Sequence, residues 1–266
     1  MFRQDRLHDG HKKKRGSELI GIIRFIHSVF FWLLVFFYSL IVHVAFYITA
    51  LFIRGEDAKD RFYQNGARLW GAVIANASLM KIEVSGLENI PVDTNVIFTP
   101  NHQSYLDIFV LLKYLPQPFR FIVMRDLFKV PVIGYYMTRA GFLSLDRKDR
   151  KNSIKTIHRI IDLLGKGESF VIFPEGKLTV DGGIGEFGRG ASIIIQRSRK
   201  PVVPILIEGT FKALPKGAWI LSGSRVRVRI GRPVYFDRYC DDVNKSASME
   251  LGVRLKGIVA GLSAGN

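Results

Sequence analysis

The sequence predicts an α/β fold, with a mostly parallel mixed sheet flanked by helices and, before it, an N-terminal membrane-embedded helical hairpin or single transmembrane helix. From residue 81 onward, apolar segments typical of strands alternate with segments of helical periodicity. Near the N-terminus, residues 25–53 form one long apolar stretch. The length of 266 residues accommodates a large domain and an appendage. We therefore divide the chain into a basic arm at 1–16, a membrane-associated helical motif at 17–80 and an α/β domain at 81–266.

The basic arm carries the run His-Lys-Lys-Lys-Arg at residues 11–15. We expect residues 1–16 to be disordered. A cluster of this kind either attracts anionic lipid head groups or is a solvated tail, and the sequence leaves both interpretations open.

The apolar stretch at residues 25–53 contains no Asp, Glu, Lys or Arg. A spanning helix needs ~20 apolar residues, so this segment is long enough to cross a bilayer or to lie within it. Basic residues, including Arg24 and Arg54, flank both ends, and the positive-inside rule places both flanks in the cytoplasm. A hairpin bent near His43 satisfies that rule better than a single span, which stays the alternative. Residues 57–80 then predict an amphipathic helix leading into the domain.

Within the domain, strand and helix signals follow one another along the chain. Strands are predicted at residues 81–84, 96–99, 169–173, 202–207 and 225–230. Helices are predicted at residues 105–114, 154–164, 191–198 and 247–262. In open sheets of this class the active site lies beyond the carboxyl ends of the strands.

The amino-acid composition limits the kinds of molecule that this chain is expected to bind. Lys and Arg number 39 and Asp and Glu 23, which gives a net charge of +16 and an affinity for polyanions. Nucleic acid and anionic lipid both fit that charge; the apolar stretch favours lipid, and we expect no nucleic-acid partner. The single cysteine, Cys240, excludes an internal disulfide. The chain shows no metal-ligand spacing, so we expect no metal ion.

The most informative motif is Asn101-His102-Gln103-Ser104-Tyr105-Leu106-Asp107. Ser104 and Asp107 match a capping box, which places His102 in a loop and Asp107 in the first helical turn. Asp107 is then able to accept the Nδ1 proton of His102 and leave Nε2 as a general base. The alternative is that Asp107 only caps the helix.

Four ordered blocks resemble those of the glycerolipid acyltransferases, which include the 1-acyl-sn-glycerol-3-phosphate (lysophosphatidate) acyltransferases. The blocks are Asn101-His102-x4-Asp107, Gly141-Phe-Leu-Ser-Leu-Asp146-Arg147, Phe173-Pro-Glu-Gly176 and Val203-Pro204-Ile-Leu-Ile. The segment from Arg125 to Gly134 also resembles the family, with Arg125 at a position usually held by Lys. An N-terminal membrane-embedded helical motif is a further family feature. The resemblance implies that residues 81–266 form an acyltransferase domain.

The resemblance also implies a reaction. His102, oriented by Asp107, takes the proton from the hydroxyl of an acceptor lipid as that hydroxyl attacks the thioester of acyl-CoA or acyl-carrier protein, which act as co-substrates rather than cofactors. Backbone N–H groups near residues 102–104 or 175–177 are candidates to stabilise the oxyanion.

Substrate-binding residues are carried over in the same way. The resemblance assigns Arg125, Arg147, Glu175, Gly176 and Lys177 to the acceptor's glycerol-phosphate end. It implies no cofactor, and the oligomeric state stays open.

One departure bears on the acceptor. After Phe-Pro-Glu-Gly the family commonly has Thr-Arg, whereas this chain has Lys177-Leu178. The leading expectation is conversion of 1-acyl-glycerol-3-phosphate to phosphatidic acid at the inner cell membrane, with the domain on the cytoplasmic face. The alternatives are the same chemistry on lysophosphatidylethanolamine or a lyso-aminolipid, or a non-catalytic protein that binds anionic lipid.

Overall fold

The computed structural model describes residues 4–130, 133–146, 149–241 and 243–264. The strands are β1 (Lys81–Ser85), β2 (Ile97–Pro100), β3 (Arg120–Met124), β4 (Leu143–Leu145), β5 (Phe170–Val171), β6 (Val202–Glu208) and β7 (Arg225–Ile230). The α-helices are α1 (Gln4–Ala50), α2 (Glu56–Ala77), α3 (Leu106–Tyr114), α4 (Ile133–Arg139), α5 (Arg150–Gly165), α6 (Arg189–Ser198), α7 (Thr210–Ala213) and α8 (Lys245–Gly261). The 3-10 helices are η1 (Leu87–Asn89), η2 (Arg125–Lys129) and η3 (Asp237–Tyr239).

The strands form one seven-stranded sheet in the order β1-β7-β6-β2-β5-β3-β4. Neighbouring strands pair in parallel, except for β6 and β7, which are antiparallel. The prediction of a mixed and mostly parallel sheet is therefore confirmed. Because β2, β5, β3 and β4 run in the same direction as β6, their carboxyl ends share one edge of the sheet.

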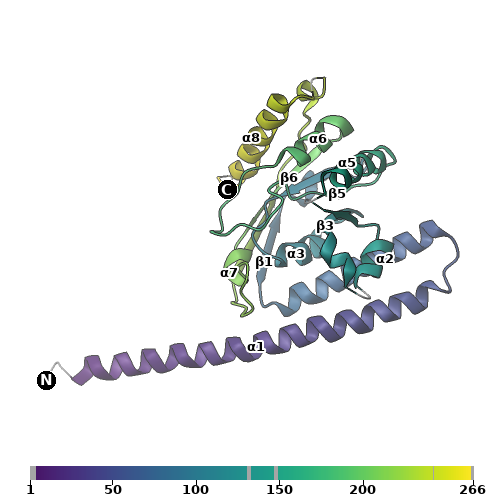
Figure 1. The fold of residues 1–266 in the computed structure, drawn as a ribbon. Helices are drawn as coiled ribbons and strands as arrows, with labels where there is room; N and C mark the ends of the chain where they lie inside the picture. The colour runs from purple at the N-terminus through teal and green to yellow at the C-terminus, as the bar shows by residue number, and fades with distance from the viewer. Residues whose placement is uncertain (1–3, 131–132, 147–148, 242, 265–266) are drawn as a thin grey trace.

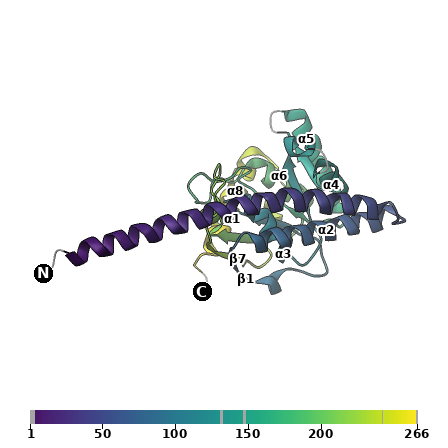
Figure 2. The ribbon, with the colours of Figure 1, turned by 90° about the horizontal axis from the view of Figure 1, so that it is seen from below.

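Helices cover both faces of this sheet (Figure 1). On one face α5, α6 and α8 pack over a core that contains Ile160, Ile194 and Leu251. On the other face α3 and α2 pack over a second core, which includes Leu111 and Ile74. Helix α1 lies outside α2 as a further layer, and its N-terminal part extends beyond the domain (Figures 1 and 2).

The N-terminal region differs from the prediction in two ways. Helix α1 begins at Gln4, so the expected disordered arm at residues 1–16 is wrong for residues 4–16. The helix also continues unbroken through His43 to Ala50, so the chain does not reverse near His43. The reversal comes at residues 51–55, and the hairpin is formed by α1 and α2. Helix α1 ends at Ala50, and Gly55, which adopts a left-handed φ of 88°, precedes α2.

Small residues allow α1 and α2 to approach closely. A Cβ atom at Gly66 of α2 would lie 2.3 Å from the ring of Phe46, so the glycine lets this ring pack directly against the backbone of α2. Buried hydroxyls add hydrogen bonds between the helices, since Trp70 Nε1 donates to Ser39 Oγ at 2.9 Å. His27 Nε2 lies 3.0 Å from the Ala77 carbonyl oxygen near the far end of α2. The contacts therefore hold α1 along the length of α2.

The opposite face of α1 is apolar and exposed. The exposed side chains include Ile23, Phe30, Phe37, Ile41 and Ile48. Within the described residues, Glu18–Ala50 is the one helical stretch long and apolar enough to cross a membrane, and its most apolar 18-residue window has a mean hydropathy of 2.3. Length and composition alone support a span. The packing adds that one side of this stretch is covered by the domain.

Most elements lie where the sequence predicts them, but β3 and β4 were not predicted. β3 begins with Arg120, a residue type unusual in the middle of a sheet, and its side chain is nearly buried. Its guanidinium donates to both carboxylate oxygens of Glu168, at 2.8 and 3.0 Å, which compensates for its burial. Gly141, with a φ of 73°, leaves room for this guanidinium, since a Cβ atom there would overlap it.

Candidate active site

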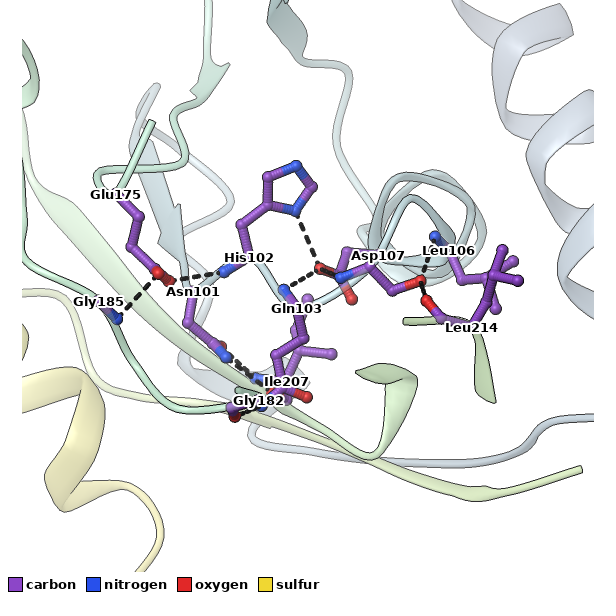
Figure 3. Close-up of polar contacts among 11 residues, drawn as sticks. Asn101, His102, Gln103, Leu106, Asp107, Glu175, Gly182, Gly185, Ile207 and Leu214 are labelled. Carbon is purple, nitrogen blue, oxygen red and sulfur yellow. Dashed lines mark hydrogen bonds and ion pairs between the residues drawn. The ribbon is translucent and has the colours of Figure 1, made fainter. Parts of the chain in front are cut away.

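The candidate site is built on the loop that leaves the carboxyl end of β2. Its first residue, Asn101, is fully buried. Asn101 Nδ2 donates to the carbonyl of Ile207 at 2.9 Å, and the Ile207 N–H donates to Asn101 Oδ1 at 2.7 Å (Figure 3). The side-chain amide thus substitutes for a peptide group in the pairing with β6, while the main chain turns away. This fixes the point from which the next residue, His102, projects.

The predicted pair of His102 and Asp107 is formed. His102 Nδ1 lies 3.0 Å from Asp107 Oδ2. The same oxygen accepts the backbone N–H of Gln103 at 2.7 Å and that of Ser104 at 2.9 Å (Figure 3). An ionised carboxylate only accepts hydrogen bonds, so His102 donates through Nδ1–H and its Nε2 carries the free lone pair. Asp107 both shapes the loop and orients the His102 ring, so the alternative that it only caps the helix is wrong.

The expected capping box is half formed. The Asp107 side chain accepts the Ser104 N–H, as in that motif. Ser104 Oγ instead accepts the N–H of Leu106 at 3.2 Å and donates to the carbonyl of Leu214 at 2.7 Å. The serine hydroxyl therefore joins the start of α3 to the segment after α7.

The imidazole of His102 is held by stacking as well as by hydrogen bonding. Its ring lies parallel to the ring of Phe173, with centroids 3.8 Å apart and an interplanar angle of 20°. The His102 side chain is 13% exposed, so solvent and substrate reach it from one side only. Figure 3 shows its second ring nitrogen pointing away from the other residues drawn. A buried carboxylate behind the ring and an open Nε2 in front are the arrangement that a general base needs.

Glu175 has a different position from the one expected of a substrate ligand. Its Oε1 accepts the backbone N–H of His102 at 2.8 Å, and its Oε2 accepts that of Gly185 at 2.9 Å (Figure 3). Burial is the main reason that the pKa of this carboxyl is raised, and the two backbone donors oppose the rise. Glu175 thus ties the catalytic loop to the glycine-rich segment at 181–188.

Sequence reasoning missed two other hydrogen bonds, one to the same segment and one to Thr179 just before it. Gln103 Nε2 donates to the carbonyl of Gly182 at 2.6 Å, and the Thr179 N–H donates to the carbonyl of His102 at 3.0 Å. Neither is visible in a motif, because any residue offers a carbonyl and an N–H. Together with Glu175 they hold the glycine-rich segment beside His102.

The remaining expected ligands surround this edge of the sheet less closely. Arg125 follows β3 and forms an ion pair of 3.1 Å with Asp146, which follows β4. Gly176 adopts a φ of 66°, and Lys177 after it is exposed. Leu178 is buried, so its position contributes no polar group to a ligand. Arg147 lies outside the described residues.

The structure also narrows the candidates for an oxyanion donor. The backbone N–H groups of residues 102–104 donate to Glu175 and Asp107, so this part of the expectation is wrong. The Gly176 N–H donates to the carbonyl of Phe173 at 2.9 Å. Among the residues that the structure describes, the N–H groups of Glu175 and Lys177 have no acceptor and stay candidates.

The chain is similar in sequence to known proteins. Residues 81–208 match the family model named Acyltransferase. The chain is 40% identical over 200 residues to 1-acyl-sn-glycerol-3-phosphate acyltransferase BAT2, chloroplastic, of Brassica napus, covering 73% of this chain and 58% of that protein. It is 32% identical over 153 residues to the Pseudomonas aeruginosa protein named 1-acyl-sn-glycerol-3-phosphate acyltransferase, covering 57% of this chain and 58% of that one. The chain thus spans just over half the length of these curated relatives.

A solved structure has the same fold. The crystal structure of the 1-acyl-sn-glycerophosphate (LPA) acyltransferase PlsC from Thermotoga maritima superposes with a TM-score of 0.76. The superposition covers 91% of this chain and 97% of that one, at 23% identity. At that identity the likeness establishes the architecture, and the sequence matches carry the family assignment.

Proposed function

Through residues 81–208 this chain belongs to the acyltransferase family, and we propose that it is a membrane-bound O-acyltransferase that moves a fatty acyl group from a thioester to the free hydroxyl of a lysophospholipid. The observation that carries the proposal is the contact between His102 Nδ1 and buried Asp107, which leaves Nε2 open. The names of the relatives support 1-acyl-glycerol-3-phosphate as the acceptor and phosphatidic acid as the product.

The reaction runs without a covalent acyl-enzyme. His102 Nε2 takes the proton of the acceptor hydroxyl as its oxygen bonds to the thioester carbonyl carbon. The carbon–sulfur bond then breaks, and the thiol leaves with the proton that His102 held. Asp107 stabilises the imidazolium between these two steps, and a positioned base of this kind contributes ~10²–10⁴ in rate. The thiol is that of coenzyme A or of acyl-carrier protein.

The acceptor's head group meets positive charge at the same edge of the sheet. Lys177 is exposed immediately after the Glu175–Gly176 turn, and Arg125 is 54% exposed beyond β3. We assign both, with Arg147, to the acceptor phosphate. Glu175 and Gly176 act by shaping the turn that presents Lys177.

A specific observation favours a second acceptor class. Leu178 takes the position at which the resembling family commonly has Arg, and its side chain is 6% exposed. A buried leucine removes a bidentate phosphate contact, and a lysine supplies only a point charge. Lysophosphatidylethanolamine, whose phosphate carries a single negative charge, is therefore the alternative acceptor.

The membrane contact is assigned to the exposed face of α1. Because α2 covers the other face of α1, we propose that α1 lies in the bilayer surface rather than crossing it. An apolar face buried at the head-group boundary is typical of interfacial helices. Basic residues at both ends of the apolar stretch favour the cytoplasmic face of the cell membrane.

Thiol release by the detergent-purified chain tests the function. Acyl-CoA and acyl-carrier protein are offered as donors, with lysophosphatidate, lysophosphatidylethanolamine and lysophosphatidylglycerol as acceptors. We expect turnover that His102→Ala abolishes and that His158→Ala, a change of an exposed histidine on α5, leaves intact. Turnover that persists in His102→Ala removes the base, and no turnover with any acceptor favours the non-catalytic lipid-binding alternative.

A further inference from the structure

The segment between α7 and β7 exposes an apolar tip that the proposed chemistry does not use. Residues 216–220, Lys-Gly-Ala-Trp-Ile, are all exposed. Trp219 is 46% exposed and Ile220 40% exposed. The flanking residues Leu214 and Leu221 are buried, so the tip stands on two fixed ends.

This tip is fastened to α1. Trp32 Nε1 donates to the carbonyl of Trp219 at 2.7 Å, and the N–H of Leu221 donates to Ser28 Oγ at 2.8 Å. The rings of Phe25 and Trp219 meet edge to face, with centroids 5.3 Å apart. Phe25 and Trp32 are themselves 48% and 38% exposed, so the exposed surface of the tip continues onto this flank of α1.

The composition of the tip matches a lipid surface. Tryptophan concentrates at the boundary between head groups and acyl chains. Lys212 and Lys216, both exposed and both before Trp219 in the chain, supply charge for anionic head groups, to which the chain's net charge of +16 adds. Lysine stems also follow apolar surface while their ammonium groups stay in water. A bilayer is the partner that satisfies an apolar tip and a basic rim together.

We propose that residues 216–220 are a second membrane contact, in which Trp219 and Ile220 enter the bilayer surface beside α1. The proposal rests on the membrane attachment through α1 proposed above. The base of the same segment reaches the catalytic motif, because Ser104 Oγ donates to the carbonyl of Leu214 at 2.7 Å. The contact thus sets the position of the His102 loop relative to the lipid surface from which the acceptor comes.

Single labelled cysteines test the proposal in the full chain. The only native cysteine is the buried Cys240, so Cys240→Ser provides the background. An environment-sensitive fluorophore is attached at Ile220→Cys, at Ile41→Cys on the exposed face of α1, and at Val253→Cys, which is 67% exposed on α8 in the layer remote from α1 (Figure 1). Each protein is mixed with phosphatidylcholine vesicles containing phosphatidylglycerol.

We expect a blue shift and a several-fold rise in emission at positions 220 and 41, and no change at 253. A response at 41 without one at 220 overturns the second contact and leaves the attachment through α1 intact. A response at neither position overturns both. Thiol release measured on the same samples reports the acyl transfer separately, so loss of one result is distinguishable from loss of the other.

A charge reversal supplies an independent readout. Lys216→Glu removes the charge beside the tip, and Lys245→Glu makes the same change at an exposed position at the start of α8. We expect several-fold weaker cosedimentation with the anionic vesicles for the first variant only. Equal binding by the two variants contradicts a basic rim at the tip.

Discussion

Replacing Asp107 by asparagine removes the negative charge beside His102 but keeps an oxygen that accepts the same hydrogen bonds. Oδ2 of Asp107 accepts the backbone N–H groups of Gln103 and Ser104 as well as His102 Nδ1. In Asp107→Asn the two backbone donors require the amide oxygen at the same place, so His102 keeps its acceptor and its tautomer. The amide NH2 then takes the position of Oδ1, which has no partner among the described residues. This unpaired donor costs about 1–3 kcal/mol of stability.

The loss in rate comes from the missing negative charge. At about 4 Å and an effective dielectric constant of about 20, a unit charge stabilises the imidazolium by ~4 kcal/mol. The positive charge on His102 is only partly developed in the transition state, and each 1.36 kcal/mol is a factor of about ten in rate. We therefore expect kcat to fall about 10²–10³-fold and KM to change little, because Asp107 is fully buried and touches no substrate.

Thiol release at saturating acceptor measures this effect, with thermal unfolding as the check that the variant is folded. Asp162→Asn is the matched control, since Asp162 lies on α5 and is exposed in an ion pair with Arg159. Activity of Asp107→Asn within a few fold of the wild type refutes the charge argument. Equal activity of a folded Asp107→Ala and Asp107→Asn refutes the claim that the pinned oxygen orients His102.

Three further outcomes follow from the same loop. In Glu175→Gln only one side-chain oxygen is left for two backbone donors, so near pH 5 we expect the free energy of unfolding to drop by about 1–3 kcal/mol, measured by denaturant titration. Burial raises the pKa of the Glu175 carboxyl above its usual value of 4.5. The contribution of this group to the free energy of unfolding is therefore fully present below pH 4.5, and it is lost as the pH rises through the raised pKa. The stability gap between wild type and Glu175→Gln then narrows as the pH rises, and a gap constant with pH contradicts this. Asn101→Ala breaks two bonds to Ile207 and leaves their buried partners unpaired, so we expect a loss of about 2–6 kcal/mol in unfolding and a sharply lower kcat; a variant as stable as the wild type contradicts the bridge.

The contact between His102 and Asp107 was predictable because it is local. His102 and Asp107 are five residues apart, and the capping pattern alone determines which of them lies in the loop and which in the helix. The strands on either side were predictable because they are apolar and bounded by turns. Glu175 was recognised as a site residue but not for its role, since its partners lie in other loops and are backbone groups that carry no sequence signal.

The extent of the N-terminal helix, in contrast, was not predicted correctly from the sequence. Charge density at residues 4–16 predicted disorder, but helical geometry tolerates Lys and Arg well and the apolar segment that follows propagates the helix. The reversal of the chain could not be located from charge balance alone. It depends on Gly55 and on the packing of α2 against α1, which a count of basic flanks does not contain.

The hydrogen bonds that fix the His102 loop join residues more than 100 positions apart, and this has a consequence for synthesis on the ribosome. The hydrogen-bond partners of Asn101 and Ser104 are Ile207 and Leu214, which are synthesised more than 100 residues later. A nascent chain therefore carries its apolar helix first, and both members of its catalytic pair long before the strand that fixes them exists. If α1 attaches the chain to the bilayer as proposed, that attachment precedes the assembly of the His102 loop, and an unfinished chain at the bilayer is then expected to release no thiol.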